Sequence, residues 1–181
     1  MSKTFDVRSL IENAQGDARP PLHLWQPELC GDIDIFIDRR GQWFHEGEPF
    51  VRDQIPKMFA RILVREGEQY FLKTPVEKWR IKVEDVPFQV VALQEEEGGA
   101  AQLTFVTSVE DVVVLDAEHP LRVEIDSQTQ EPSPYITVRD GLEAKLSRSV
   151  FYQLAELAEL DEAGAELYIE SCGERFVLGA V

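Results

Sequence analysis

The sequence predicts an α+β fold made of two small similar units, each a mostly antiparallel sheet with one main helix. Most apolar residues alternate with polar ones at the two-residue period of a strand, whereas only two segments have the spacing of an amphipathic helix. The chain has 181 residues and is 44% hydrophobic, which is enough apolar material for a packed core. The order strand, turn, strand, helix, hairpin also occurs twice along it.

The first unit is expected at residues 21–86, where alternating apolar residues predict strands. A leader segment of residues 1–20 precedes it, with one short helix around Val7–Asn13. Turn residues separate the expected strands, which are Ile33–Ile37, Gln42–His45, Gln69–Lys73 and Trp79–Val83.

One helix interrupts these strands, because apolar residues between Ile55 and Leu63 recur at the spacing of a single helix face. Proline is tolerated in the first turn of a helix, so Pro56 places the helix start near Arg52–Gln54. Gly67 is expected to end this helix.

The second unit is expected at residues 87–181, because Asp85 and Pro87 break the strand pattern. The acidic run Gln94–Ala101 lies between two strand-like segments and is expected to be a hairpin tip rather than a linker. Ser147 is expected to cap the second helix, which carries Val150, Phe151, Leu154 and Leu157. Strands are expected at Phe88–Leu93, Leu103–Ser108, Val112–Leu115, Leu121–Ile125, Tyr135–Val138, Leu167–Glu170 and Arg175–Leu178, with Glu131–Pro134 as a loop.

The two expected helices match in residue type, since Arg52, Ile55 and Met58 correspond to Arg148, Phe151 and Leu154. Either common α+β segments recur by coincidence, or the chain contains a duplicated unit. In the second case the two units would meet at an interface, which is a favoured place for a ligand pocket.

The charge excludes some classes of partner. Eighteen Lys and Arg against 34 Asp and Glu give a net charge of −16, which disfavours non-specific binding to nucleic acids or acidic membranes. No signal peptide or membrane-spanning stretch is recognisable, so we expect a cytoplasmic protein. Cys30 and Cys172 are expected to be buried or partly buried free thiols, with a disulfide or redox switch as the alternative. No metal site and no cofactor are expected.

No motif of a known enzyme class occurs in the sequence. Four carboxylates, Asp32, Asp34, Glu77 and Asp85, either form a metal or acid–base cluster or lie on a solvated surface, and the second interpretation is favoured.

The segment from Lys73 to Phe88 combines turn residues, basic residues and aromatics. Its Thr-Pro turn is expected to expose the Thr74 hydroxyl, and Lys78 and Arg80 are expected to project from one face of a strand. The alternative is an ordinary exposed strand face opposite a buried one.

Arg52 and Arg148 each lie near an expected helix start, where free amides and a guanidinium can bind an anion together. The alternative is an arginine paired with one of the many carboxylates.

The sequence resembles a bacterial family called domain of unknown function 1285 over roughly residues 20–181. The resemblance lies in Cys30-Gly31-Asp32-Ile33-Asp34-Ile35, Gly41-x-Trp43-Phe44, Gly47-x-Pro49-Phe50-x-Arg52, Thr74-Pro75-Val76-Glu77-Lys78, Val83-Glu84-Asp85-x-Pro87-Phe88, Pro134-Tyr135, Arg139-x-Gly141-Leu142-Glu143-Ala144, Ser147-Arg148 and Ser171-x-Gly173. The family tends to follow Ser-x-Gly with an aromatic pair, whereas this chain has Glu174-Arg175-Phe176.

This resemblance implies a duplicated α+β core, a C-terminal part loosely like a pleckstrin-homology fold, and a role in bacterial signalling without established catalysis. It also implies a site for a nucleotide-like ligand at the domain interface. We therefore expect a non-catalytic regulatory protein that binds a small anionic molecule. Alternatives are a protein-interaction adaptor that uses an exposed sheet face and, ranked last, a metal-dependent hydrolase.

The expected ligand-binding residues are Arg52, Thr74, Glu77, Lys78, Phe88, Tyr135, Arg139 and Arg148. The basic residues would neutralise the anion, Phe88 or Tyr135 would stack on a ring, and Glu77 would accept a hydrogen bond from a ring or sugar.

Overall fold

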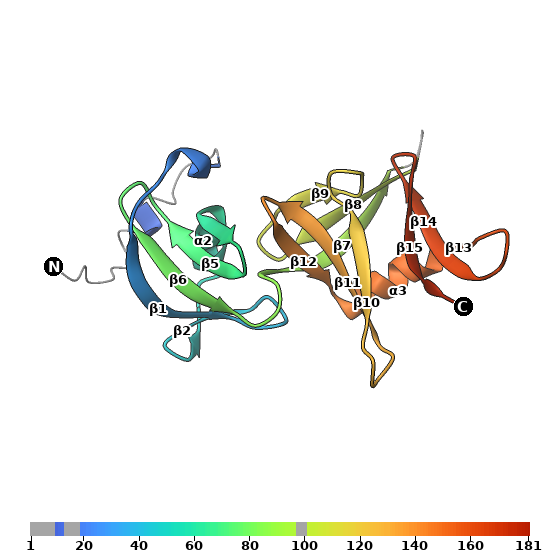
Figure 1. Cartoon of the computed structure of the whole chain (residues 1–181), viewed down its shortest axis with the longest axis horizontal. Coiled ribbons are helices and arrows are strands. Elements are labelled where there is room, and N and C mark those ends of the chain that lie inside the picture. Colours follow the sequence, from blue (N-terminus) through green and yellow to red (C-terminus); the bar gives the residue numbers. More distant parts are fainter. Residues whose placement is uncertain (1–9, 13–18, 97–100) are drawn as a thin grey trace. The chain divides into compact units, whose positions relative to one another are not determined.

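A computed structural model describes residues 10–12, 19–96 and 101–181 of the chain. The chain divides into two compact units, Met1–Pro87 and Phe88–Val181, each of which is described by itself (Figure 1). The helix expected around Val7–Asn13 lies mostly outside the described residues, of which 10–12 are helical. The tip of the acidic hairpin, residues 97–100, lies outside them as well.

Unit 1 contains one six-stranded sheet with the strand order β3-β2-β1-β6-β5-β4. The strands β1 and β6 at its centre are parallel, and all other neighbours are antiparallel. Its elements are η1 (Leu22–Leu24), β1 (Leu29–Ile37), β2 (Trp43–His45), β3 (Glu48–Pro49), α2 (Gln54–Arg61), β4 (Leu63–Glu66), β5 (Gln69–Lys73) and β6 (Lys78–Val83).

The core of unit 1 follows from the alternation that the sequence shows. Ile33, Ile35 and Ile37 on β1 are buried, whereas Asp32 before them and Asp34 among them are exposed. One side of β1 therefore packs inward from Ile33 to Ile37, as expected for a half-buried strand. Buried apolar side chains from the rest of the unit complete the core: Trp43, Phe59, Ile62, Leu63, Phe71, Leu72, Trp79 and Ile81.

The helix of unit 1 is shorter than predicted, since α2 ends at Arg61 and Leu63 begins a strand. Leu63 pairs with Leu72 and Glu66 with Gln69, so the residues after the helix are held in a hairpin. Gly67 does not end the helix; it forms the hairpin turn with a φ of +62°. Strand pairing therefore outweighs the helical spacing at the end of the apolar stripe.

Unit 2 contains a second six-stranded sheet, with the order β10-β11-β12-β7-β8-β9, and a three-stranded sheet, β13-β14-β15. The central strands β7 and β12 are parallel. Its elements are β7 (Phe88–Glu96), β8 (Gln102–Thr107), β9 (Val112–Val114), β10 (Leu121–Ile125), β11 (Pro132–Arg139), β12 (Leu142–Leu146), α3 (Arg148–Glu156), β13 (Glu159–Leu160), β14 (Glu166–Ser171) and β15 (Glu174–Ala180).

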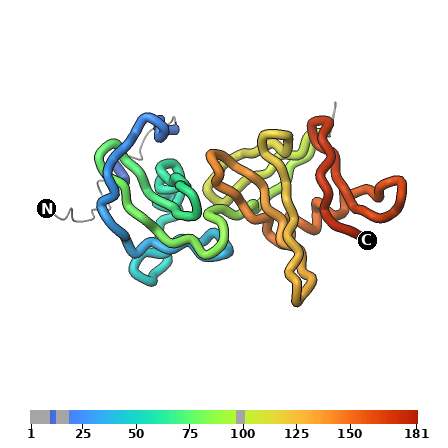
Figure 2. The backbone as a smooth tube through the Cα atoms, viewed as in Figure 1, coloured from blue at the N-terminus to red at the C-terminus, as the bar shows by residue number. Residues whose placement is uncertain are grey.

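The end of unit 2 is attached to its sheet by specific contacts. Helix α3 begins as predicted, because the Ser147 hydroxyl accepts a hydrogen bond from the Val150 backbone N–H at 3.4 Å. The Ser171 hydroxyl at the end of β14 accepts one from the Leu103 N–H on β8 at 3.0 Å. In Figure 2 the chain can be followed from β10 through the turn at residues 126–131 into β11.

Two predictions for unit 2 are wrong. Pro132–Pro134, expected in a loop, belong to β11 and pair with β10 beyond the end of β12, where the missing proline N–H groups break no ladder with a second neighbour. The strand β12 was not predicted, although Leu142, Ala144 and Leu146 alternate and are buried. Apart from their alternation, the five residues of β12 are typical of a helix, because none of them is β-branched or aromatic.

The predicted α+β class with two similar, mostly antiparallel units is confirmed. When the strands of each large sheet are numbered from one in chain order, both sheets have the same spatial order, 3-2-1-6-5-4. In both, the first and last strands form the parallel central pair. Two units of the same topology thus follow each other in the chain.

The predicted alignment of the two units is nevertheless wrong. Helix α2 lies between the third and fourth strands of unit 1, whereas α3 follows the sixth strand of unit 2. The matching of Arg52, Ile55 and Met58 with Arg148, Phe151 and Leu154 therefore joins positions that are not equivalent. The duplicated feature is the sheet, and strand β1 corresponds to β7.

Candidate functional site

Unit 1 has a pocket of about 390 Å³ beside the turn end of its β5–β6 hairpin. Lys73 is the last residue of β5, Lys78 is the first residue of β6, and Glu66 ends β4. The segment before β1 supplies the remaining residues. Together the lining consists of His23, Trp25, Gln26, Pro27, Glu66, Lys73 and Lys78, which we call the lysine pocket.

The two lysines of this pocket face each other across the hairpin. Lys73 and Lys78 are directly paired residues on antiparallel strands, so their side chains lie on the same face of the sheet. Lys73 is 9% exposed, which is unusual for a lysine. Among the residues that the structure describes, no carboxylate lies within ion-pair distance of Lys73. Its positive charge is therefore available to a ligand in the pocket.

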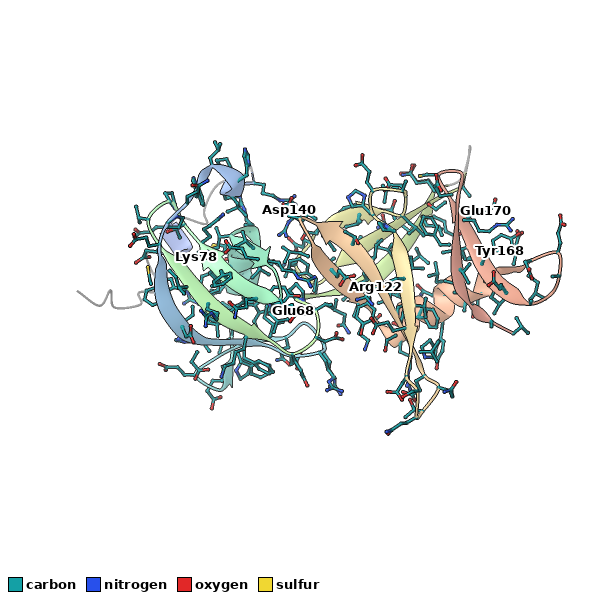
Figure 3. All side chains as sticks on the ribbon, in the orientation of Figure 1. Glu68, Lys78, Arg122, Asp140, Tyr168 and Glu170 are labelled. Atoms are coloured by element: carbon teal, nitrogen blue, oxygen red, sulfur yellow. The ribbon has the colours of Figure 1, made fainter. Side chains whose placement is uncertain are left out.

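Lys78, in contrast, is held by two contacts within unit 1. Its Nζ lies 2.5 Å from Glu66 Oε2 and 4.6 Å from the centre of the Phe71 ring. The side chain of Lys78 is labelled in Figure 3. The side chain of Lys78 is 17% exposed and that of Glu66 is 47% exposed. The ion pair therefore lies at the rim of the pocket and neutralises one of its two lysines.

The turn between the two lysines does not have the predicted property. The Thr74 side chain is fully buried, and its hydroxyl accepts a hydrogen bond from the Glu77 backbone N–H at 3.0 Å. The Thr74 N–H in turn donates to the Glu77 carbonyl at 2.8 Å. The expectation of an exposed Thr74 hydroxyl is wrong, because the hydroxyl closes the turn. Its role is to fix the hairpin end that carries Lys73 and Lys78.

The two arginines predicted at helix starts occupy different positions. Arg52 is exposed and lies before α2, where its carbonyl accepts a hydrogen bond from the Ile55 N–H at 3.0 Å. Arg148 is the first residue of α3, and its side chain is 72% exposed, with Nη2 3.7 Å from a carboxylate oxygen of Glu131. Arg148 and Glu131 line a smaller pocket of about 260 Å³ in unit 2, together with Pro132, Ser133, Pro134, Lys145, Leu146, Phe151 and Tyr152.

The two predicted ring-stacking residues belong to unit 2 and are buried. Phe88 is 1% exposed, and the Arg139 guanidinium lies 5.2 Å from its ring centre. Tyr135 is 5% exposed, and the Arg122 guanidinium lies 4.2 Å from its ring centre. Hydrogen bonding to Glu143 raises the pKa of Arg122 above its usual range, so this cation stays charged.

The repeated topology gives Lys73 a counterpart in unit 2. Lys73 ends the fifth strand of unit 1, and Arg139 ends the fifth strand of unit 2. The side chain of Arg139 is only 9% exposed, and its Nη2 lies 3.7 Å from a carboxylate oxygen of Asp111. Unit 2 thus contains a counter-ion for its buried cation, whereas Lys73 has none among the described residues.

Other candidate groups are dispersed. Within the described ranges, no three His, Cys, Asp or Glu side chains gather where they would hold a metal ion. Asp32, one of the four carboxylates considered above, lies 3.5 Å from Arg80. Both cysteines are free, and Cys172 is exposed, so the expectation that it is buried or partly buried is wrong. No helix of the described part has the length and apolarity to cross a bilayer.

Sequence reasoning identified Lys78 but did not identify Lys73, Glu66 or Trp25 as site residues. Lys73 and Lys78 enclose a four-residue turn between two predicted strands, so hairpin pairing alone would have placed them opposite each other. No comparable signal marks Glu66 or Trp25, because their position depends on how β4 and the segment before β1 pack.

The fold and the pocket define a two-domain α+β protein with a duplicated sheet and a partly basic pocket in its first domain. The chain belongs to the family of unknown function DUF1285: the family's N-terminal domain matches residues 20–86, and its C-terminal domain matches residues 87–178. No curated protein matches the sequence significantly.

Two solved structures of the same family are similar to this chain. A DUF1285 family protein from Silicibacter pomeroyi DSS-3 is 37% identical, with a TM-score of 0.90, and the match covers 99% of this chain and 97% of that one. A DUF1285 family protein from Shewanella baltica OS155 is 28% identical, with a TM-score of 0.54, over 67% of this chain and 90% of that one.

Proposed function

We propose that the protein is a non-catalytic, ligand-binding regulatory module that holds a small anionic molecule in the lysine pocket. The observation that carries this proposal is Lys73, a lysine that is only 9% exposed and has no counter-ion among the described residues. Desolvating an unpaired charge is unfavourable, and a bound anion would offset that cost.

The rest of the pocket indicates what else the ligand carries. Trp25 is partly exposed and supplies an aromatic surface, and Gln26 adds an amide that can both donate and accept hydrogen bonds. A volume of about 390 Å³ suits a ligand of the size of a nucleotide or an aromatic acid. The ligand class that fits is therefore a ring with an anionic group, which includes nucleotide-like molecules.

The proposal is tested by titrating the purified protein with nucleotides, cyclic nucleotides and aromatic carboxylates while following its thermal unfolding. Binding ligands should raise the melting temperature, because they stabilise only the folded state. Lys73→Met should weaken binding by tenfold or more, as expected for the loss of a charge-assisted hydrogen bond worth about 1.5–3 kcal/mol.

Lys82→Met is the matched control, because Lys82 is exposed on β6 and does not line the pocket. It should bind the same ligands as the unmodified protein. Stabilisation by no compound of the panel, or equal stabilisation of the Lys73→Met variant, would contradict the proposed function.

A further inference from the structure

The ion pair at the rim of the lysine pocket has a consequence for the charge of the ligand. Two ammonium groups and one carboxylate line the pocket, and the 2.5 Å contact between Lys78 and Glu66 neutralises one of the ammonium groups. The remaining charge of these side chains is a single positive one, on Lys73.

Lys78 is also restrained on a second side. Its Nζ lies 4.6 Å from the centre of the Phe71 ring, on the strand that ends with Lys73. The backbone of Glu66 in turn is held by its pairing with Gln69 next to the turn at Gly67. To turn toward a ligand, Lys78 would have to give up both its carboxylate partner and its aromatic contact.

We infer that the lysine pocket selects an anionic group with one negative charge, such as a carboxylate or a phosphodiester, over a doubly charged phosphate monoester. This inference rests on the function proposed above and assigns Glu66 as the residue that determines specificity. A second negative charge in the pocket would lie close to the Glu66 carboxylate without a free cation to balance it, and like charges held close together disfavour binding.

The experiment compares three probes that share one phenyl ring: benzoate, methyl phenyl phosphate and phenyl phosphate. At pH 8 the first two carry one negative charge and the third carries two, because the second pKa of a phosphate monoester is about 6. All three tryptophans, Trp25, Trp43 and Trp79, lie in unit 1, and Trp43 and Trp79 are only 3% and 4% exposed. Quenching of tryptophan fluorescence therefore reports on Trp25, and Trp25→Phe confirms the assignment.

In the unmodified protein, benzoate and methyl phenyl phosphate should bind about tenfold more tightly than phenyl phosphate. Glu66→Gln releases Lys78 and should remove that difference or reverse it. Glu68→Gln, in the same turn but outside the pocket lining, changes the net charge equally and should leave the selectivity unchanged. Lys78→Met leaves the Glu66 carboxylate without its partner and should widen the difference.

Phenyl phosphate binding as tightly as benzoate to the unmodified protein would overturn the inference while leaving the proposed function intact. Unchanged selectivity in both Glu66→Gln and Lys78→Met would overturn it as well. Binding of none of the three probes to the unmodified protein would contradict the proposed function itself, and the inference with it.

Discussion

Replacing Lys73 by methionine should stabilise unit 1 in the absence of a ligand. Lys73 is 9% exposed and directly opposite Lys78 on the neighbouring strand. Methionine has a similar length and no charge, so Lys73→Met removes both the charge of a largely buried residue and a like-charge pair. Like charges opposite each other in a sheet are destabilising by roughly 0.2–1 kcal/mol, and relief of desolvation adds to this gain.

A total gain of about 1 kcal/mol corresponds to a rise of roughly 2–4 °C in the melting temperature of a protein of this size. Tryptophan fluorescence measures it, because all three tryptophans lie in unit 1 and therefore follow the unfolding of that unit. With a bound anion the unmodified protein should have the higher melting temperature of the two, since only the unmodified protein is stabilised by the ligand.

Lys82→Met controls for the loss of a positive charge on an exposed position of β6, and its stability should change by less than about 0.5 kcal/mol. A lower melting temperature for Lys73→Met in ligand-free protein would refute the reasoning. It would mean that the Lys73 ammonium makes a stabilising interaction in the folded state, and the pocket would then have no free charge to offer.

Three further predictions concern elements outside the pocket. Ser147→Ala removes the cap of α3 and should lower the free energy of unfolding of unit 2 by about 1 kcal/mol in urea titrations followed by circular dichroism. Gly67→Ala places a residue with a side chain in the left-handed conformation of the β4–β5 turn, although its Cβ would meet no neighbour there. It should lower the free energy of unfolding by about 1 kcal/mol in the same titration followed by fluorescence. Hydrogen bonds from the Arg39 backbone N–H and guanidinium lower the pKa of Glu84, so its contribution to stability is present above the ordinary carboxyl pKa and is lost as the pH falls through the lowered one. Glu84→Gln should therefore make stability depend less on pH in the acid range, and an unchanged acid profile would contradict this.

Local patterns predicted most of the strands and both helix starts. Gln69–Lys73 and Leu121–Ile125 match β5 and β10 residue for residue. Leu121–Ile125 alternates apolar and polar side chains, and Gln69–Lys73 is a short apolar run next to turn residues, and both are local signals of a strand. The end of α2 was predicted wrongly, because Leu63 continues the helical spacing but pairs with Leu72, which lies beyond a turn. Helical spacing alone does not show which residues will find a strand partner.

The order and pairing of the strands could not be predicted from the sequence. The parallel pairing of β1 with β6 and of β7 with β12 joins residues far apart in the chain, and no local property of either strand encodes its partner. The site has the same limitation. Lys78 was recognisable from its position after a Thr-Pro turn, whereas its ion pair with Glu66 depends on the neighbouring hairpin.

The central pairing of the first and last strands makes each sheet depend on completed synthesis. While a ribosome is still translating residues before Lys78, β1 has no inner neighbour, and only the outer meander β1–β3 and the hairpin β4–β5 are able to form. A nascent chain shortened by a premature stop codon in this region would expose two unpaired strand edges to proteases and to aggregation. Translation of the second half repeats the same vulnerable interval until β12 emerges.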